Sequence, residues 1–203
     1  MSPKFVHLHL HSEYSLVDGL VRIPELISHC TQNGTAAIAL TDQSNVFGSS
    51  KFFRSAMSAG IKPIIGAELW VVDSENTGKP YKIVFLCQNN LGYKNLSILL
   101  TRAYREGQHR GIPMVHENWL TISQLTGIIC LSGGISGDIG LAFLTGSKET
   151  MLRSAAKWQA LIGERYYLEV FRTGRLQEEA YLQEVASVAE HLAIPLVATN
   201  DVR

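Results

Sequence analysis

Three histidines near the start of the chain have the spacing most suggestive of chemistry. His7, His9 and His11 alternate with single leucines, and Asp18 follows after a short turn. In a β-strand, alternate side chains leave the same face, so three imidazoles would line one side of this segment. Imidazole and carboxylate groups are usual ligands of zinc, manganese and iron. The pattern predicts a metal site or the descendant of one. The alternative is a short strand with incidental histidines.

Short apolar segments alternate with amphipathic ones along the rest of the chain. We predict strands at residues 5–11, 35–41, 62–72, 81–87, 127–132, 165–171 and 194–199. We predict helices at residues 23–33, 49–59, 91–106, 138–144, 147–162 and 176–192, a polar turn at 74–80 and an irregular segment at 107–121. Such alternation is typical of a parallel sheet covered by helices.

Polar side chains recur at the ends of these predicted strands, namely His9, His11, Asp42, Glu68 and Asp201. In a barrel, functional residues lie at the carboxyl ends of several strands, and closure of the sheet brings those ends around one point. The distribution therefore favours a seven-stranded α/β barrel over an open doubly wound sheet. We expect residues 1–203 to form one domain. No helix follows the last strand, which suggests that the chain is a piece of something larger.

The composition limits the classes of partner. Charged residues make up 18% of the chain, against a usual share of about 25%, which suggests surface hidden against other domains or subunits. The net charge is zero, so no broad basic field attracts nucleic acid. Cys30, Cys87 and Cys130 are odd in number and far apart, and we expect core thiols. The sequence has neither a signal core nor a membrane-length apolar run, so we expect a cytoplasmic location and no membrane contact.

Two weaker motifs have an ordinary explanation and a functional one. The glycine-rich residues 132–137 could hold a phosphate, but they lack a P-loop lysine, which favours a tight strand-to-helix turn. Arg102, Arg105, His109 and Arg110 could contact DNA phosphates or a partner. The neutral net charge favours a solvated helix end instead.

Five segments of the chain together resemble the polymerase and histidinol phosphatase (PHP) domain family. Within that family, they are most similar to the N-terminal domains of bacterial DNA polymerase III alpha subunits. The segments are residues 5–19, 39–42, 60–68, 90–96 and 198–201. The resemblance covers the whole chain and implies a distorted (β/α)7 barrel, similar to a TIM barrel. In active members, three metal ions in a cup at the strand ends cleave phosphoesters.

The resemblance implies a broken set of metal ligands. The family ligands retained in this sequence are His9, His11, Asp18, Glu68 and Asp201. The changed positions are Gln43, Lys82 and Arg203, each in place of a histidine, and Gly134, in place of a cysteine or histidine. We predict that the two new cations form salt bridges with the acidic ligands, because unpaired buried charge is costly. No cofactor is expected. The alternative is one zinc or manganese ion held weakly by His9, His11 and Asp18.

The resemblance also implies a function within a replicative DNA polymerase. The main hypothesis is a domain without nuclease chemistry that stabilises the alpha subunit and docks a separate proofreading exonuclease subunit. It would meet DNA only through the full-length subunit, whose polymerase site these residues do not supply. The alternative is a residual metal-dependent phosphoesterase, either a 3′–5′ exonuclease or a pyrophosphatase, whose retained ligands would activate water.

Overall fold

The helices predicted from the sequence are all present, each within two residues of its predicted ends, in a computed structural model that describes residues 5–73 and 79–203. The predicted turn at 74–80 falls mostly outside this described part. The elements in chain order are α1 (Ile23–Gln32), β1 (Ala37–Leu40), α2 (Ser49–Ser58), β2 (Lys62–Val72), β3 (Tyr81–Cys87), α3 (Asn90–Glu106), β4 (Gln108–His109), β5 (Ile112–His116), η1 (Glu117–Trp119), β6 (Ile128–Leu131), η2 (Gly134–Ser136), α4 (Asp138–Leu144), α5 (Lys148–Ile162), η3 (Gly163–Arg165), β7 (Tyr166–Val170), α6 (Glu178–Leu192) and β8 (Leu196–Ala198).

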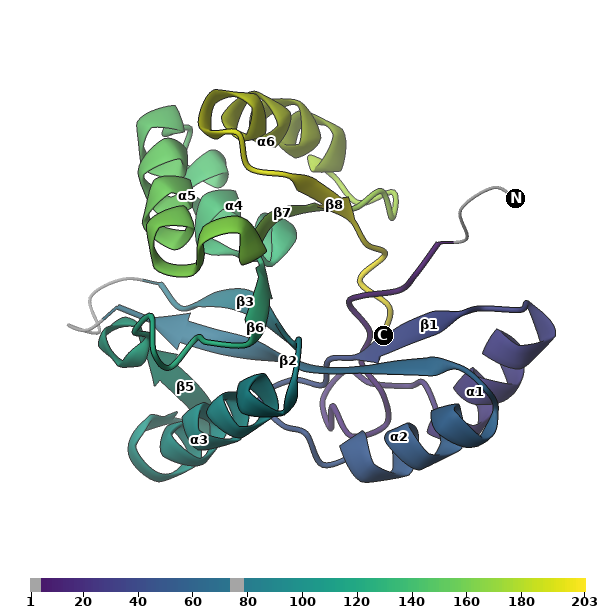
Figure 1. Cartoon of the computed structure of the whole chain (residues 1–203). Coiled ribbons are helices and arrows are strands. Elements are labelled where there is room, and N and C mark those ends of the chain that lie inside the picture. Colours follow the sequence, from purple (N-terminus) through teal and green to yellow (C-terminus); the bar gives the residue numbers. More distant parts are fainter. Residues whose placement is uncertain (1–4, 74–78) are drawn as a thin grey trace.

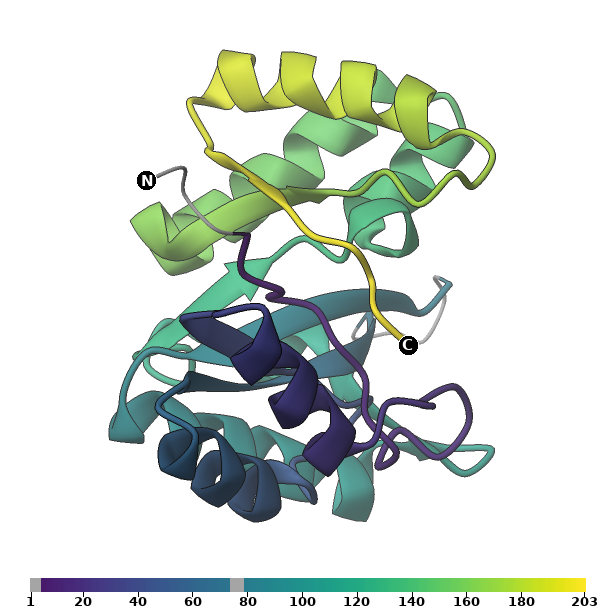
Figure 2. The same cartoon turned by 90° about the vertical axis from the view of Figure 1, so that its right-hand side faces the viewer.

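Backbone hydrogen bonds connect the strands into a ring. The order of pairing is β1, β2, β3, β6, β7 and β8. Residues 7–11 complete the ring between its ends. On one side Ala39 N donates to His7 O and Thr41 N to Leu10 O, both at 2.9 Å. On the other side Leu10 bridges to Val202, just past β8. Figures 1 and 2 show the segment that contains residues 7–11 and the segment after β8 side by side. The predicted α/β barrel therefore agrees with the structure, with residues 7–11 as its seventh extended segment.

The first predicted strand, residues 5–11, is extended but is not a regular strand. The Thr41 hydroxyl accepts a hydrogen bond from Leu10 N at 2.8 Å and donates one to Leu10 O at 3.1 Å. A side chain thus interrupts the backbone ladder at this point. The irregularity ends one step later, where His11 N donates to Val202 O at 2.8 Å.

The sheet is mixed, and the prediction of an all-parallel sheet was wrong. β3 runs antiparallel to both of its neighbours, β2 and β6. Only residues 73–80 separate β2 from β3, whereas a parallel crossover needs a dozen or more residues. A connection this short therefore forces the chain to reverse direction between these two strands.

The segment predicted to be irregular, residues 107–121, contains a hairpin. β4 pairs antiparallel with β5, and β5 extends the sheet in parallel beside the second half of β2. Arg110 and Gly111 form the turn, both with positive φ (52° and 81°). These strands are too short for an alternating pattern to stand out in the sequence.

Three apolar clusters fix the strands and helices in place: one, formed by Ala39, Val84, Leu86 and Leu131, lies among the strands, and two pack helices against strands. The larger lies between β3, β6 and β7 and the helices α3 to α6, and it includes the stacked rings of Trp158 and Tyr166. The smaller joins α1 and α2 to β1 and residue Leu10. The three cysteines are free, as expected. Among the described helices, none is both long and apolar enough to cross a membrane.

Candidate functional site

The candidate site lies where the ends of several extended segments meet. Its residues come from the first segment (His9, His11), the loop after it (Asp18), β2 (Glu68), β3 (Lys82), β7 (Glu169) and the segment after β8 (Asp201, Arg203). The ring of strands brings together residues that are far apart in the chain. Most of these side chains are buried, so each charge must find a partner inside the protein.

Glu68 is the centre of the site, with an exposed fraction of only 1%. Lys82 Nζ lies 2.7 Å from Glu68 Oε2. His9 Nε2 and His11 Nε2 each lie 3.2 Å from a Glu68 carboxylate oxygen. Burial alone would raise the pKa of Glu68, but the contacts with His11, His9 and Lys82 hold it well below its usual range. Glu68 is therefore a carboxylate at neutral pH, with its charge matched by neighbouring side chains.

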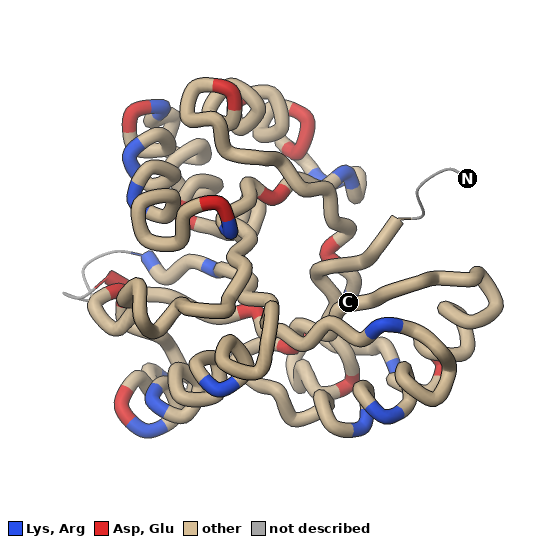
Figure 3. The backbone as a smooth tube through the Cα atoms, viewed as in Figure 1, with Lys and Arg blue, Asp and Glu red and all other residues tan. Residues whose placement is uncertain are grey.

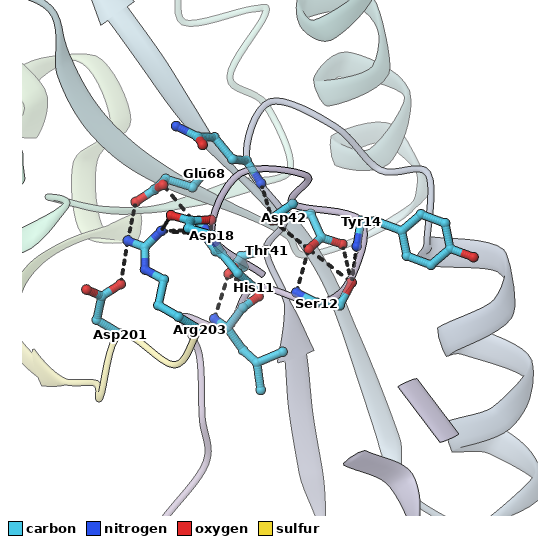
Figure 4. Close-up of polar contacts among 12 residues, drawn as sticks. His11, Ser12, Tyr14, Asp18, Thr41, Asp42, Glu68, Asp201 and Arg203 are labelled. Atoms are coloured by element: carbon cyan, nitrogen blue, oxygen red, sulfur yellow. Dashed lines mark hydrogen bonds and ion pairs between the residues drawn. The ribbon is translucent and has the colours of Figure 1, made fainter. Parts of the chain in front are cut away.

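The Arg203 guanidinium bridges three carboxylates (Figure 4). It forms ion pairs with Asp18, with Asp201 at 2.7 Å and with Glu68 at 3.5 Å. Arg203 also lies 2.8 Å from His11 Nδ1, which in turn lies 2.9 Å from Asp18 Oδ1. One planar cation thus holds acidic groups from the loop after the first segment, from β2 and from the segment after β8.

Glu169 belongs to the site, and the sequence analysis missed it. Its Oε1 lies 2.9 Å from His9 Nδ1 and accepts a hydrogen bond from the Thr199 hydroxyl at 2.6 Å. Burial opposes the charged form of His9, but Glu169 and Glu68 raise the pKa of His9 to about 10. A carboxylate inside the otherwise apolar residues 166–171 was the available signal, since such a group must be paired.

Arg175, in the loop after β7, is a second residue that the sequence analysis missed. Its Nη1 lies 2.7 Å from Asp201 Oδ2. Glu178 shapes this loop by accepting hydrogen bonds from Thr173 N at 2.6 Å and Gly174 N at 2.9 Å. Burial would raise the pKa of Glu178, but these hydrogen bonds lower it. Nothing in the local sequence distinguishes Arg175 from other surface arginines.

The remaining changed positions, Gln43 and Gly134, offer little to a metal ion. Gln43 lines a cavity of about 390 Å³ together with Asp18 and Lys82. Gly134 has a φ of +56°, and a Cβ there would lie 2.2 Å from the Phe171 ring. A ligand side chain at position 134 would therefore need both a strained backbone and a displaced ring.

Two candidates from the sequence lie outside this cluster. The His7 ring packs edge-on against Phe5, with ring centroids 5.0 Å apart. The Asp42 carboxylate accepts hydrogen bonds from Ser12 N at 2.6 Å and the Ser15 hydroxyl at 2.8 Å. Asp42 thus fixes the loop that carries Asp18.

Packing explains the glycine-rich motif, and one member of the basic cluster, Arg102, makes contacts within the chain. A Cβ at Gly133 would lie 2.2 Å from Lys82 O, so the glycine-rich turn lies tightly against β3. Arg102 lies over the Trp119 ring at 4.1 Å and forms an ion pair with Glu106 at 2.8 Å. The Arg102 side chain therefore interacts with neighbouring residues of its own chain.

The site also contains a group that could hold a metal. His9, His11 and Glu68 each offer one ligand atom, and these atoms lie within 4.8 Å of one another. The same atoms already contact other charged groups. Both ring nitrogens of His9 face carboxylates, and Glu68 faces Lys82 and Arg203.

Comparison with known proteins identifies the family. The PHP domain profile matches residues 7–173. The chain is 42% identical over 200 residues to the DNA polymerase III alpha subunit of Vibrio cholerae, covering 98% of this chain and 17% of that protein. It is 43% identical over 203 residues to the alpha subunit of Pseudomonas fluorescens, covering 100% of this chain and 17% of that protein. For Escherichia coli K12 the identity is 40% over 201 residues, covering 99% of this chain and again 17% of the relative. The chain thus spans about a sixth of the length of these relatives.

Solved structures share the fold at low sequence identity. A provisionally named metal-dependent phosphoesterase from Bifidobacterium adolescentis aligns with a TM-score of 0.63 and 10% identity, over 97% of this chain and 87% of the other. An amidohydrolase from Chromobacterium violaceum, with bound sulfate and no metal, aligns with the same TM-score and coverage at 16% identity. This chain therefore belongs to the PHP domain family and corresponds to the N-terminal region of bacterial DNA polymerase III alpha subunits.

Proposed function

We propose that this PHP domain has exchanged its metal cup for a protein-only ion-pair network and serves its polymerase subunit as a structural element and docking platform. One observation carries the proposal. Lys82 and Arg203, at two changed ligand positions, contact the retained acidic positions Asp18, Glu68 and Asp201. Each basic group supplies the positive charge that metal ions would otherwise bring.

The charges in the network balance without a metal. The acidic members are Asp18, Glu68, Glu169 and Asp201, and the basic members are Lys82, Arg175, Arg203 and the protonated His9. Added divalent ions would have to displace these cations, because like charges at such distances repel strongly. A metal also needs a free nitrogen lone pair on its histidine ligands, whereas both nitrogens of His9 face carboxylates. The residues present therefore do not fit a multinuclear metal cluster.

The role in the longer protein is proposed from the relatives. The natural protein would be a DNA-directed DNA polymerase whose active site lies outside these 203 residues, and it would work in the cytoplasm. Because the domain supplies no nuclease site, proofreading would come from a separate exonuclease subunit docked on it. DNA would be reached through the full-length subunit.

Elemental analysis of the purified protein tests the loss of the metal cup. We expect less than one zinc or manganese ion per chain, and no change in melting temperature on treatment with a chelator. The double variant Lys82→His/Arg203→His should bind more metal, whereas the matched surface variant Lys62→His/Arg153→His should not. Two or three tightly held ions in the unmodified protein would contradict the proposal.

One observation favours a second candidate function, a residual phosphoesterase. The ligand atoms of His9, His11 and Glu68 lie close enough to share one ion. If zinc or manganese binds there weakly, the protein would hydrolyse a 3′-labelled oligonucleotide or pyrophosphate when manganese is added, and Asp18→Ala would abolish this activity. We expect no hydrolysis above that of the Asp18→Ala variant.

A further inference from the structure

Exposed apolar side chains gather around the cavity beside Asp18 and Lys82. Five of the residues that line this cavity are large, apolar or aromatic, and exposed, namely Leu16, Val17, Phe47, Tyr104 and Ile112. Their exposed fractions range from 40% for Tyr104 to 93% for Val17. Because all five line the same cavity, they form one contiguous patch, which we call the apolar rim. Such patches mark interaction sites, whereas exposed apolar side chains that are scattered singly do not.

The loop that carries Leu16 and Val17 is held in one shape. Ser15 N donates a hydrogen bond to Ser12 O, and Gly19 N donates one to Ser15 O, both at 2.8 Å. The turn is so tight that a Cβ at Gly19 would lie 1.8 Å from Ser12 O. The loop therefore presents its two apolar side chains outward in a fixed position. Contact with another apolar surface would stabilise them, because it removes apolar area from water.

The charged groups at the cavity are already paired. Among the described residues, Asp18 and Lys82 are the charged ones that line it. Asp18 forms an ion pair with Arg203, and Lys82 lies 2.7 Å from Glu68. Many of the other Lys and Arg positions lie on the surrounding helices α2, α3 and α5 (Figure 3). Complementary charge steers partners that bind and dissociate, whereas permanent interfaces are more apolar. The apolar rim therefore fits a permanent neighbour.

Residue 203 lies beside the apolar rim. Val202 bridges to Leu10 in parallel, and Arg203 pairs with Asp18, which follows Val17 directly. Figure 2 shows this end of the chain next to the loop that precedes α1. The chain spans 17% of the Vibrio cholerae alpha subunit and corresponds to the N-terminal region of such subunits. In a subunit of that length, the remaining polypeptide would therefore start its path at the rim.

We propose that the part of the alpha subunit that follows Arg203 packs an apolar surface onto the apolar rim and closes the cavity. A segment of the same polypeptide is brought to the rim by its covalent connection, so it needs no charge to steer it. A small apolar ligand would fill the cavity but would leave Leu20, which is 85% exposed in the same loop, uncovered. The inference rests on the proposed structural role in the polymerase subunit, and it names the surface through which the domain would fulfil that role.

Thiol labelling of the full-length subunit tests whether the rim is covered. Val17→Cys and the matched control Leu176→Cys replace side chains that are both 93% exposed in this domain. Each variant is labelled with a maleimide, and mass spectrometry of the peptide that contains the new cysteine gives the rate. We expect Val17→Cys to react at least about tenfold more slowly in the full-length subunit than in the 203-residue chain, because a covered residue reacts only when its cover opens. Leu176→Cys should react at similar rates in both. An unchanged rate for Val17→Cys would overturn the inference.

Photocrosslinking identifies what covers the rim, and it needs only the full-length subunit. A benzophenone is attached at Leu20→Cys, and the subunit is irradiated alone and with the exonuclease subunit. We expect cross-links from position 20 to peptides beyond residue 203 of the same polypeptide in both samples. Cross-links only to the exonuclease, or only to a second copy of the subunit, would overturn the inference. If the exonuclease does not bind and position 20 still joins to later residues, the docking role fails and this inference stands.

Discussion

Replacing Lys82 with methionine tests whether this lysine compensates the charge of the buried Glu68 carboxylate. The substitution keeps most of the side-chain volume and removes the charge 2.7 Å from Glu68. Removing one partner of a buried ion pair costs roughly 3–5 kcal/mol, because the other charge is left uncompensated. Glu68 keeps contacts with His9 and His11 at 3.2 Å and with Arg203 at 3.5 Å, which places the cost near the lower end, at about 3 kcal/mol.

Differential scanning calorimetry at pH 7 measures the effect. For a chain of this size each kcal/mol lowers the melting temperature by roughly 2–4 °C, so we expect a fall of about 6–12 °C. The matched control is Lys148→Met, which removes an exposed lysine 4.0 Å from Glu184. An exposed pair of this kind contributes less than about 1 kcal/mol, so the control should melt close to the unmodified protein.

A double-mutant cycle separates the ion pair from other effects of the substitution. Glu68→Gln/Lys82→Met removes both charges, so its loss of stability should be smaller than the sum of the two single losses by at least about 1.5 kcal/mol. If Lys82→Met melts within 2 °C of the unmodified protein, or if the two losses simply add, the lysine does not compensate Glu68. The reasoning behind the metal-free network would then be refuted.

Three further predictions concern the same site. Burial opposes both shifts, but the pKa of Glu68 is held low and that of His9 is raised to about 10. The lowered pKa of Glu68 stabilises the folded protein above the ordinary Glu pKa of about 4.3, and this contribution is lost in acid. The raised pKa of His9 stabilises the folded protein below the ordinary His pKa of about 6.5, and this contribution is lost as pH rises towards 10. Melting temperatures from pH 3 to 10 should therefore peak near pH 5–6.5, and a flat profile would contradict this. Gly134→Ala should cost about 2–4 kcal/mol in urea unfolding, because its Cβ meets a ring at positive φ, whereas Gly146→Ala, also at positive φ but in open space, should cost about 1–2. Equal losses would refute the steric argument. Glu178→Gln should cost about 1–2 kcal/mol and speed proteolysis of residues 172–177, since it weakens the acceptor that orders this loop. Unchanged cleavage would show that the loop is held otherwise.

Local patterns in the sequence were enough to place most helices and strands. β2 and β3 have the bounds that their apolar runs predict, and α5 begins after Ser147, whose hydroxyl accepts from Thr150 N as a helix cap. Such features depend on residues a few positions apart, so a single sequence contains them. The gathering of His9, His11 and Glu68 in one place also followed from strand order, once a barrel was expected, although Glu68 lies within β2 and not at its end.

The direction of β3 could have been predicted from the short connection between the predicted strands 62–72 and 81–87. The tertiary structure alone decided the full membership of the charged network. Glu169 meets His9 and Arg175 meets Asp201 only because the ring of strands closes through residues 7–11 and 200–202. No local pattern marks these contacts, since buried charges choose partners by proximity in space and by the need to balance each other. The sequence by itself therefore determined the segments and the candidate ligands. The closed sheet determined which charges compensate one another.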